Sequence, residues 1–438
     1  MPTRKERWRF LPSANARGIR ATIVMNILIC NNRYFPSTGP EKYLFSVTPL
    51  LESHGHHVVP LAIAWEANEP TPYAHYFVSP PIDGKSVFFR QYRDRLTPMN
   101  QWRLFARAAY NEDAKAAAGR IIDAEKIDLL YVLHTVNMLS PSVIDAAAER
   151  HIPVVMRLSD FNLLCPAYLF LRDGKVCTEC LGGLHHAIEH RCLQHSVAVT
   201  TARVMAMRVH QARGIYKRVN AFICPSRYMA EQMEHFAPAR GKLHHIPSFV
   251  DLDAITPRAT NQGYLLFFGR IARDKGLDVL LQAHALLAPS VPLIIAGTST
   301  DSYRQELDEL LAPHQRESVH FVGFKAGKDL DDLIDGAIAT VVPSRWHDNS
   351  PMSVYESLAH GKPVVGSDMG GIAEQVTPDC GFLVPPDDSD ALRDRLQRLI
   401  DDPALVTRMG HAARARAEAA FSPASHYDQL MRVFGKVG

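Results

Sequence analysis

Two acidic side chains eight positions apart, Asp348 and Glu356, are candidates for chemistry in this chain. They belong to the stretch WHDNSPMSVYE (346–356), which follows the β-branched run IATVVPS (338–344), typical of a buried strand. We therefore expect Asp348 in a strand-to-helix loop and Glu356 about one and a half turns into the next helix. Both carboxylates would flank the positive end of that helix, where an anion or a polyol can dock.

The residues between these acids indicate where the helix begins. Asn349 and Ser350 are both suitable N-caps, because their side chains can accept hydrogen bonds from the free amides of a first turn. Pro351 suits the first helical position, since its missing N–H would have had no partner there. The pattern predicts a helix that starts at Pro351.

Cations and glycines follow two other strands in the same half of the chain. In FGRIARDKG, Arg270 and Lys275 lie between a strand end and a helix that is expected to begin near Lys275, an arrangement that suits a diphosphate. In SDMGGIAE, Gly370 and Gly371 would let backbone amides approach a phosphate or a sugar ring closely. Taken singly, the first loop is better explained as a solvated turn, and the second is a weak signal because Gly-Gly turns are common.

Four of the seven cysteines fall within 28 residues, separated by eleven, two and eleven intervening residues. Four thiolates suit tetrahedral zinc, which would rigidify a loop of Gly, Lys and Asp with little core of its own. The candidate ligands are Cys165, Cys177, Cys180 and Cys192, and one of them could be replaced by His185, His186 or His190. An iron–sulfur cluster, a disulfide pair and reduced buried thiols are the alternatives.

Strand-like runs alternate with helix-like segments and must position these residues. The alternation implies right-handed βαβ units and parallel sheets, hence an α/β protein. Two doubly wound sheets in tandem place a ligand cleft between the C-terminal ends of their strands. The first set of runs is 26–30, 58–64, 128–134, 153–159 and 221–226, and the second is 264–270, 292–297, 319–323, 338–344, 363–367 and 381–385.

Length and composition narrow the class of protein. A chain of 438 residues favours two domains. Its 48 basic and 46 acidic residues give a net charge of +2, which argues against a dedicated nucleic-acid binder. The sequence contains no run of about 18 apolar residues, so no membrane span is predicted.

The basic residues 1–24 lack the apolar core of a signal peptide, so we expect either a loose tail or an upstream start before Met25. The odd number of cysteines, without a secretion signal, indicates the cytoplasm.

Taken in order, three segments of the second half resemble glycosyltransferase family 4, the "glycosyl transferases group 1". They are GRIARDKG, PSRWHDNSPMSVYESLAHGKPVVGSDMGGIAEQV and GFLVPPDD. In the first half, NILICNNRYFPSTGPEKYLF, CPSRYMAEQM and KLHHIPSFVDLD are similar to other parts of that family, so the resemblance covers Met25 to the C-terminus.

The resemblance implies the GT-B fold, in which two Rossmann-like domains enclose a cleft. It divides the chain into an acceptor-side domain (25–245) with a cysteine-rich insertion (165–192), a linker (246–263), a nucleotide-sugar domain (264–421) and a terminal helix (422–438). In that family the terminal helix crosses back onto the first domain.

The resemblance also implies roles for single residues. Arg270 and Lys275 match the pair that binds the donor diphosphate, and Glu356 matches the acid that binds the ribose hydroxyls. Asp348 takes the place of the acid that faces the donor sugar and the reaction centre, although Glu is usual there. The remaining residues implied on the donor side are Asn349 and Ser350, which replace a commoner Gly-Phe-Gly together with Pro351, and the glycine pair Gly370 and Gly371.

On the acceptor side the match is less complete. Ser159 stands where many relatives carry the active-site histidine, while the following Asp160 is retained. His134, at the end of the previous predicted strand, either faces the same cleft or is a strand-end histidine without a role. Gly39 lies in the loop after the first strand, which is also expected at the cleft.

The resemblance implies a retaining glycosyltransferase that moves a sugar from a nucleotide-sugar donor to a glycan or a lipid-linked acceptor, in cell-surface polysaccharide or glycoconjugate synthesis. No catalytic divalent metal and no nucleic-acid partner are expected, and structural zinc is left open. The basic and aromatic stretch near 98–123 could contact the cytoplasmic face of a membrane. Its pattern is more typical of a surface helix with one face in the core. The alternatives are a degenerate, non-catalytic nucleotide-sugar or glycan-binding protein, an epimerase of the same fold, and an oxidoreductase, which the lack of a Gly-x-Gly-x-x-Gly loop disfavours.

Overall fold

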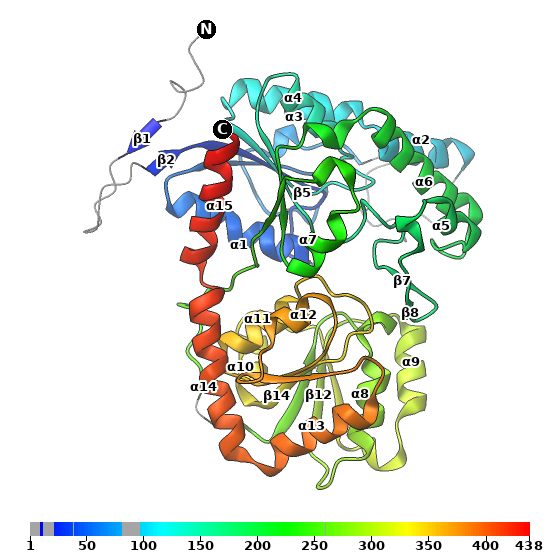
Figure 1. The fold of residues 1–438 in the computed structure, drawn as a ribbon, viewed down its shortest axis with the longest axis vertical. Coiled ribbons are helices and arrows are strands. Elements are labelled where there is room, and N and C mark those ends of the chain that lie inside the picture. Colours follow the sequence, from blue (N-terminus) through cyan, green and yellow to red (C-terminus); the bar gives the residue numbers. More distant parts are fainter. Residues whose placement is uncertain (1–8, 12–21, 38, 81–96, 259) are drawn as a thin grey trace.

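The computed structural model describes residues 9–11, 22–37, 39–80, 97–258 and 260–438. Two parallel six-stranded sheets form two domains, which lie one above the other in Figure 1. The predicted α/β class with two Rossmann-like domains is confirmed. Arg9–Leu11 (β1) pairs antiparallel with Thr22–Val24 (β2), whereas most of the predicted basic tail lies outside the described residues.

The first sheet has the strand order β10-β9-β6-β5-β3-β4, so its centre is formed by strands far apart in the sequence. Its strands are β3 (Asn26–Asn31), β4 (His57–Leu61), β5 (Leu129–His134), β6 (Val154–Arg157), β9 (Ala221–Cys224) and β10 (Leu243–His245). The helices of this domain are α1 (Gly39–Ser53), α2 (Pro98–Ala109), α3 (Glu112–Ala124), α4 (Ser142–Ala148), α5 (His185–Glu189), α6 (Val197–Ala212) and α7 (Arg227–Met233).

The second sheet has the order β13-β12-β11-β14-β15-β16. Its strands are β11 (Tyr264–Phe268), β12 (Leu293–Ala296), β13 (Val319–Gly323), β14 (Ala337–Val342), β15 (Val364–Ser367) and β16 (Gly381–Val384). The remaining helices are α8 (Leu277–Ala285), α9 (Asp301–Leu310), α10 (Lys328–Gly336), α11 (Met352–Ala359), α12 (Gly370–Gln375), α13 (Ser389–Asp401), α14 (Pro403–Ala420) and α15 (Pro423–Val437).

Alternating side chains of β3 explain why both faces of the first sheet are covered. Leu28 and Cys30 join one buried apolar cluster, whereas Ile27 and Ile29 join another on the opposite face. A strand that is apolar at every position is typical of such doubly covered parallel sheets. The strand β10 was not predicted from the sequence, because its three residues, Leu-His-His, do not form an apolar run.

The C-terminal helix α15 packs on the first domain, although the chain before it belongs to the second (Figure 1). Leu430 and Phe434 share an apolar cluster with β3 and β5. The buried His426 ring lies 2.8 Å from the Tyr43 hydroxyl on α1 and 2.8 Å from the Pro247 carbonyl. Burial lowers the pKa of His426 to about 3, so the ring is neutral in the folded protein.

The stretch predicted as one helix near 98–123 is two helices, α2 and α3, separated at Tyr110 and Asn111. Asn111 caps α3 by accepting a hydrogen bond from Ala114 N at 3.1 Å. On α2, Met99 and Trp102 are exposed, at 60% and 62%. Among the residues that the structure describes, no helix combines the length and apolar character of a membrane span.

Candidate functional site

The loops after the central strands of both sheets face each other across the domain boundary. Residue pairs from the two domains join these loops directly. The Ser226 hydroxyl, which caps α7 in the first domain, donates to Asn349 Oδ1 at 2.9 Å. The Glu374 carboxylate of α12 accepts from the backbone amides of Arg227 and Tyr228, at 2.8 and 2.7 Å, where α7 begins. The predicted strand ends of the two domains therefore meet at the domain boundary.

The predicted diphosphate pair lies in the loop between β11 and α8. Arg270 donates two hydrogen bonds to the Asp274 carboxylate, at 3.1 and 2.5 Å, while half of its side chain remains exposed. Lys275 ends a 3-10 turn (Arg273–Lys275), so α8 starts at Leu277, two residues later than expected. The turn is possible because Gly276 has φ +65° and a Cβ there would meet the Pro343 carbonyl at 1.9 Å.

Asp348 and Lys275 form a direct ion pair between two loops of the second domain. Both side chains are largely buried, and the Ser344 hydroxyl lies 3.4 Å from the same carboxylate. The Asp348 backbone is also fixed, since its carbonyl accepts from Gly371 N at 2.7 Å. A buried pair of this kind is costly to break unless another charge takes the place of one partner.

The glycine pair packs against the loop that carries Asp348. A Cβ on Gly371 would lie 1.9 Å from the Asn349 carbonyl, so glycine is required for the close approach of the Asp348 loop. Because Gly371 N already donates to Asp348, its amide is occupied in this arrangement. The pair thus fixes the loop that carries the acid, and the Gly371 amide is used in doing so.

The residues between the two acids also differ from expectation. Helix α11 begins at Met352 with Pro351 in the N-cap position, so neither Asn349 nor Ser350 caps it. Asn349 is buried and serves the domain boundary, whereas the Ser350 hydroxyl lies 2.6 Å from the Tyr355 hydroxyl. Both side chains therefore have protein partners in this arrangement.

Glu356 meets the first domain. Its carboxylate accepts from Lys42 Nζ of α1 at 2.9 Å, with 19% of the Glu356 side chain and 41% of the Lys42 side chain exposed. Lys42 is not among the residues predicted from the sequence, and its only signal is its place three residues after Gly39 in the loop-to-helix stretch GPEKYLF. Gly39 itself is the first residue of α1.

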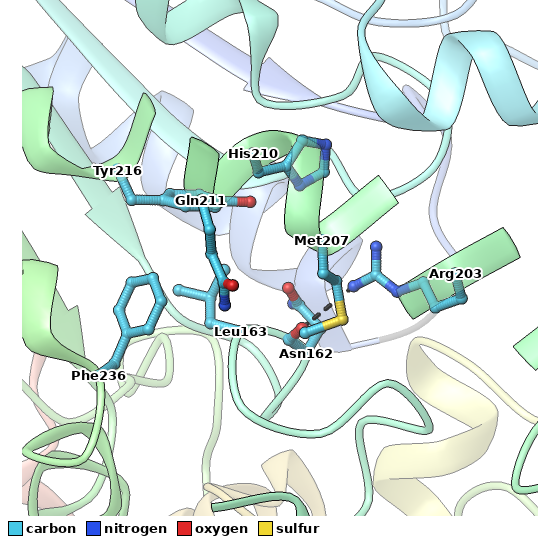
Figure 2. A pocket seen from close by; sticks show the side chains of 8 residues that line it. All are labelled: Asn162, Leu163, Arg203, Met207, His210, Gln211, Tyr216 and Phe236. Carbon is cyan, nitrogen blue, oxygen red and sulfur yellow. Dashed lines mark hydrogen bonds between the residues drawn. The ribbon is translucent and has the colours of Figure 1, made fainter. Parts of the chain in front are cut away.

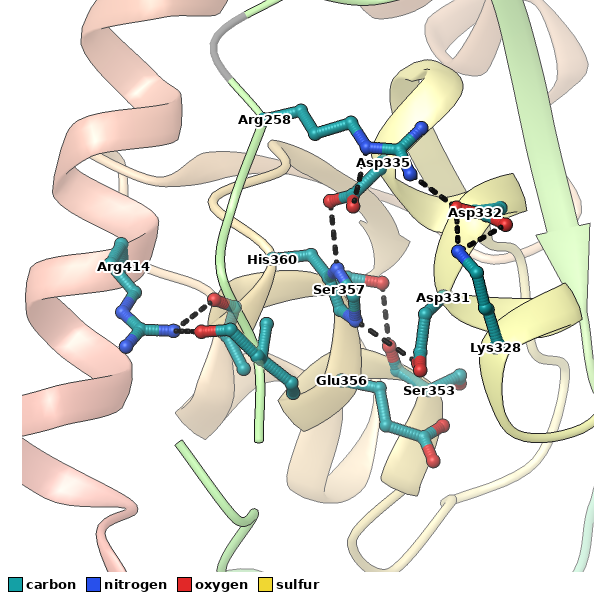
Figure 3. Close-up of polar contacts among 12 residues, drawn as sticks. Arg258, Lys328, Asp331, Asp332, Asp335, Ser353, Glu356, Ser357, His360 and Arg414 are labelled. Carbon is teal, nitrogen blue, oxygen red and sulfur yellow. Dashed lines mark hydrogen bonds and ion pairs between the residues drawn. The ribbon is translucent and has the colours of Figure 1, made fainter. Parts of the chain in front are cut away.

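The far end of α11 is anchored by a separate polar network, shown in Figure 3. His360, at the C-cap, binds Asp335 of α10 at 2.8 Å and lies 3.4 Å from Asp331. Figure 3 shows Glu356 directed away from this network. The network therefore holds the far end of the helix without engaging Glu356, which contacts Lys42.

On the first domain, the structure brings His134 and Asp160 together. His134 Nε2 lies 3.7 Å from Asp160 Oδ2, and Asn162 N donates to the same carboxylate at 2.9 Å. Burial raises the pKa of Asp160, but the His134 ring and the Asn162 amides outweigh it and hold that pKa below its usual value. The buried Ser159 hydroxyl has no hydrogen-bond partner among the described residues.

A narrow cavity lies next to Asn162 (Figure 2). Arg203 of α6 donates to the Asn162 carbonyl at 3.1 Å and to Asn137 Oδ1 at 3.3 Å. Figure 2 shows the Arg203 side chain reaching toward Asn162. Arg203 therefore holds the backbone of the segment that follows Asp160.

The four predicted metal-ligating cysteines lie in the irregular segment between β6 and α6, and all four are free thiols. A hydrogen bond from Cys180 and the backbone amides of Phe170, Ala167 and Tyr168 lower the pKa of Cys165, against the effect of burial. The same hydrogen bond and burial raise the pKa of Cys180. Burial, Cys165 and Cys177 raise the pKa of Cys192. The four thiols are thus within electrostatic range of one another.

Comparison with known proteins bears on the second domain. Residues 251–416 match the family model described as "Glycosyl transferases group 1". The second domain belongs to the group 1 glycosyl transferases. A relative with 28% identity over 179 residues is the α-D-kanosaminyltransferase of Streptomyces kanamyceticus. That match takes in 40% of this chain and 46% of the relative, so the chain spans about half the length of this curated relative.

Solved structures extend the likeness to both domains. A sucrose-phosphate synthase from Thermosynechococcus elongatus has a TM-score of 0.70 at 19% identity, covering 94% of this chain and 98% of its own. The Anabaena protein HepE, solved in complex with UDP-glucose, has a TM-score of 0.62 at 18% identity, covering 94% and 100%. With a group 1 domain in its second half, the chain therefore has the GT-B fold over nearly its whole length.

Proposed function

We propose that this protein is a retaining glycosyltransferase, which moves a sugar from a nucleotide-sugar donor to a glycan or lipid-linked acceptor. The observation that carries the proposal is the Lys275–Asp348 ion pair within a group 1 glycosyl transferase domain. It places a cation and a carboxylate, both largely buried, between the loops that follow β11 and β14. Asp348 would face the donor sugar, while Lys275 would transfer its contact to the donor diphosphate.

A departing nucleoside diphosphate gains negative charge, which fixed cations stabilise without reorganisation. Lys275 is held by its partner, and Arg270 is held by Asp274 with half of its side chain exposed. Both cations can therefore meet a diphosphate with little loss of side-chain freedom. Under this proposal no catalytic divalent metal is required.

Glu356 would bind the ribose hydroxyls of the donor. In the arrangement described, its carboxylate is bound to Lys42 of the first domain. A ribose would then compete with Lys42, and donor binding would be coupled to the contact between α1 and α11. The His134–Asp160 pair, on the opposite side, is proposed to face the acceptor.

The second candidate is a non-catalytic protein that binds a nucleotide sugar or a glycan. The buried Ser159 hydroxyl, in place of a histidine, favours it, because a serine cannot supply the same hydrogen bond or charge. The two candidates differ in one product. A transferase releases nucleoside diphosphate and forms a new glycosidic bond, whereas a binding protein leaves the donor intact.

The experiment begins with a thermal-shift screen of nucleotide sugars against the full chain, followed by a turnover assay with the stabilising donor. We expect one donor class to raise the Tm and to be consumed when glycan or lipid-linked acceptors are added, with the anomeric configuration retained. Donor binding without consumption across the acceptor panel would favour the second candidate. No stabilisation by any nucleotide sugar would contradict both.

The cellular setting belongs to the same proposal. We place the reaction in the cytoplasm, where nucleotide sugars are the donors, and in the synthesis of a cell-surface polysaccharide or glycoconjugate. A lipid-linked acceptor would require approach to the inner face of the membrane, and the exposed Met99 and Trp102 on α2 are suited to that approach.

A further inference from the structure

We propose that Glu179, His186 and His190 bind one divalent transition-metal ion of the Zn²⁺ class on the surface of the first domain. The inference concerns a second site and does not depend on the sugar-transfer proposal. Glu179 begins a 3-10 turn (Glu179–Leu181), His186 lies in α5, and His190 ends that helix. The ligand atoms of these three side chains lie within 4.8 Å of one another.

Helix α5 explains why the two histidines are neighbours. Leu184 and Ala187 are buried in a small apolar cluster with α6, and Ile188 packs against that cluster. His186 and His190 are four residues apart, so they lie side by side on the helix surface. His190 N donates to the His186 carbonyl at 3.0 Å, which fixes this spacing. Their side chains are 32% and 33% exposed, so a metal ion can reach both rings from solvent.

The Glu179 carboxylate meets the histidines from the other side. Its Oε2 atom lies 2.7 Å from His190 Nε2, and its Oε1 atom lies 3.0 Å from the guanidinium of Arg172. Arg172 belongs to a hairpin of two short strands, β7 (Leu171–Arg172) and β8 (Lys175–Val176). Because a carboxylate has two acceptor oxygens, Oε1 can keep Arg172 while Oε2 binds a metal. Ligating carboxylates are usually hydrogen-bonded in this way by a second residue.

A further carboxylate orients the His186 ring. His186 Nδ1 lies 3.0 Å from Glu189 Oε2, so this nitrogen is engaged and Nε2 is left for a metal. Metal-binding histidines commonly donate their other ring N–H to a carboxylate, which fixes the ring and makes the ligand nitrogen more basic. Glu189 is therefore a positioning residue of the proposed site.

The spacing and the chemistry of the three groups both suit zinc. Bonds of about 2.0–2.1 Å to tetrahedral Zn²⁺ place the ligand atoms about 3.4 Å apart. The observed spacings include this value, since the Glu179–His190 contact is 2.7 Å and no pair exceeds 4.8 Å. Small rotations of partly exposed side chains would complete the geometry. Two histidines and one glutamate are a set that zinc takes in sites with an open fourth position, which water would fill here.

A second set of possible ligands shares His186. The ligand atoms of His185, His186 and Glu189 also lie within 4.8 Å of one another. Consecutive helical residues do not face each other, however, and the His185 ring packs over Gly183, where a Cβ would meet it at 2.6 Å. Binding through Glu189 would also remove the contact that orients His186. The set that contains Glu179 and His190 is therefore the better site.

The cysteines predicted as ligands from the sequence do not form a group of this kind. In the part of the chain that the structure describes, the groups of three or more ligand atoms within 4.8 Å contain only histidine and glutamate. They include none of Cys165, Cys177, Cys180 and Cys192. The geometry thus favours nitrogen and oxygen ligands in this segment over the predicted sulfurs.

The ion would join two parts of a segment that has little apolar core. The side chains of the β7–β8 hairpin are partly or fully exposed, and Figure 1 shows the hairpin extending from the first domain in the direction of the second. Glu179 lies just after this hairpin, whereas both histidines lie on the helix that packs on α6. A metal cross-link between them would offset part of the entropy lost in ordering the segment.

The test is isothermal titration calorimetry of the full, reduced chain with Zn²⁺, after chelation and without a histidine tag. We expect one saturable site per chain. His186→Ala, His190→Ala and Glu179→Gln should each weaken binding by at least about tenfold, because even residues behind the ligands commonly contribute that much. His185→Ala and His195→Ala should keep the wild-type affinity, and His195 is the matched control, an exposed histidine of the same segment.

Replacement of Zn²⁺ by Co²⁺ identifies the ligand atoms. Nitrogen and oxygen ligands should give d–d bands without a thiolate-to-metal charge-transfer band, in the wild type and in Cys180→Ser alike. A charge-transfer band, or loss of binding in Cys180→Ser, would overturn the proposal in favour of the cysteines. Loss in His185→Ala with retention in His190→Ala would overturn it in favour of the second set, and the lack of any saturable Zn²⁺ site would overturn it outright.

A measurement on the wild-type protein alone covers variants that fail to fold. Zn²⁺ should slow limited proteolysis within 171–195, because the cross-link holds this segment. Equal cleavage with and without Zn²⁺ would contradict the proposed cross-link. None of these results would affect the assay of sugar transfer.

Discussion

The two sides of the cleft hold their polar groups in different ways. In the second domain, cations and carboxylates form close pairs between strand-end loops, such as Lys275 with Asp348 and Arg270 with Asp274. In the first domain, His134 and Asp160 lie in a hydrogen-bond network that is supported from behind by Asn162 and Arg203. A charged side chain that is paired with another can change its partner for a charged group of a ligand. A hydrogen-bond network that is held by its neighbours keeps its geometry when a neutral ligand binds. The contrast fits a charged donor on one side and an uncharged hydroxyl on the other.

The largest expected effect is on turnover when the paired cation is removed. Lys275→Ala should lower kcat by about 10²–10³-fold, the usual cost of losing one group that stabilises developing charge. Steady-state assays with the donor identified by thermal shift would measure it. Lys328→Ala is the matched control, because Lys328 is 81% exposed and pairs only with Asp332 among the described residues. Equal turnover in both variants would remove Lys275 from the reaction.

The next effect concerns the other side of the cleft. His134→Ala should lower kcat/KM for the acceptor by at least about tenfold, or about 1.4 kcal/mol. Asp160→Asn should act in the same direction, because the 3.7 Å contact and the Asn162 hydrogen bond both depend on the carboxylate. If the two variants changed only the donor KM, the assignment of the sides would be reversed.

The junction between the domains is expected to respond to pH through α15. Burial lowers the pKa of His426 to about 3 and that of His56, which contacts Tyr427 of α15, to about 4. The unfolded chain then binds more protons below pH 6.5, so stability is complete above that pH and falls as the pH decreases toward 3. Each histidine can contribute up to about 1.4 kcal/mol per pH unit in this window.

Chemical denaturation between pH 7 and pH 4 would measure this loss. His426→Gln should reduce the slope of stability against pH, whereas His411→Gln, at an exposed position of α14, should leave it unchanged. A slope that is unaffected by His426→Gln would show that other groups govern the acid sensitivity.

The smallest effect is expected at the contact between the two sides. If Lys42 competes with the donor ribose for Glu356, Lys42→Ala should tighten donor binding, by no more than about fivefold for a partly exposed ion pair. Glu356→Ala should weaken it. Isothermal titration calorimetry with the donor would show whether each variant binds it more tightly or more weakly than the wild type. Weaker binding in Lys42→Ala would mean that Lys42 contacts the donor itself.

The same contrast explains how much the sequence could predict. The two sheets and the loops with Arg270, Lys275 and Asp348 follow from local patterns, because each residue stands a few positions from a strand end. Contacts between distant segments could not be predicted in this way, such as Lys42 with Glu356 or Ser226 with Asn349. These pairs form only when the two domains pack together, and the residues of one segment alone do not predict that packing.

The helix start at α11 shows the same limit on a smaller scale. Asn349 has the side chain of a good N-cap, yet it binds Ser226 and the Leu158 carbonyl across the boundary. A tertiary contact thus overrides a local preference worth about 1 kcal/mol. The strand β10 was missed for a similar reason, since it is defined by its pairing with β9 and not by its side chains.

The central claim is that the second domain alone binds the donor, and donor affinity in a matched pair of variants tests it most directly. Isothermal titration calorimetry with the stabilising nucleotide sugar should show weaker binding in Lys275→Ala and wild-type affinity in His134→Ala. Both side chains contact a carboxylate at the cleft, in different domains, so the pair isolates the side of the cleft. Wild-type affinity in Lys275→Ala together with weakened binding in His134→Ala would contradict the account.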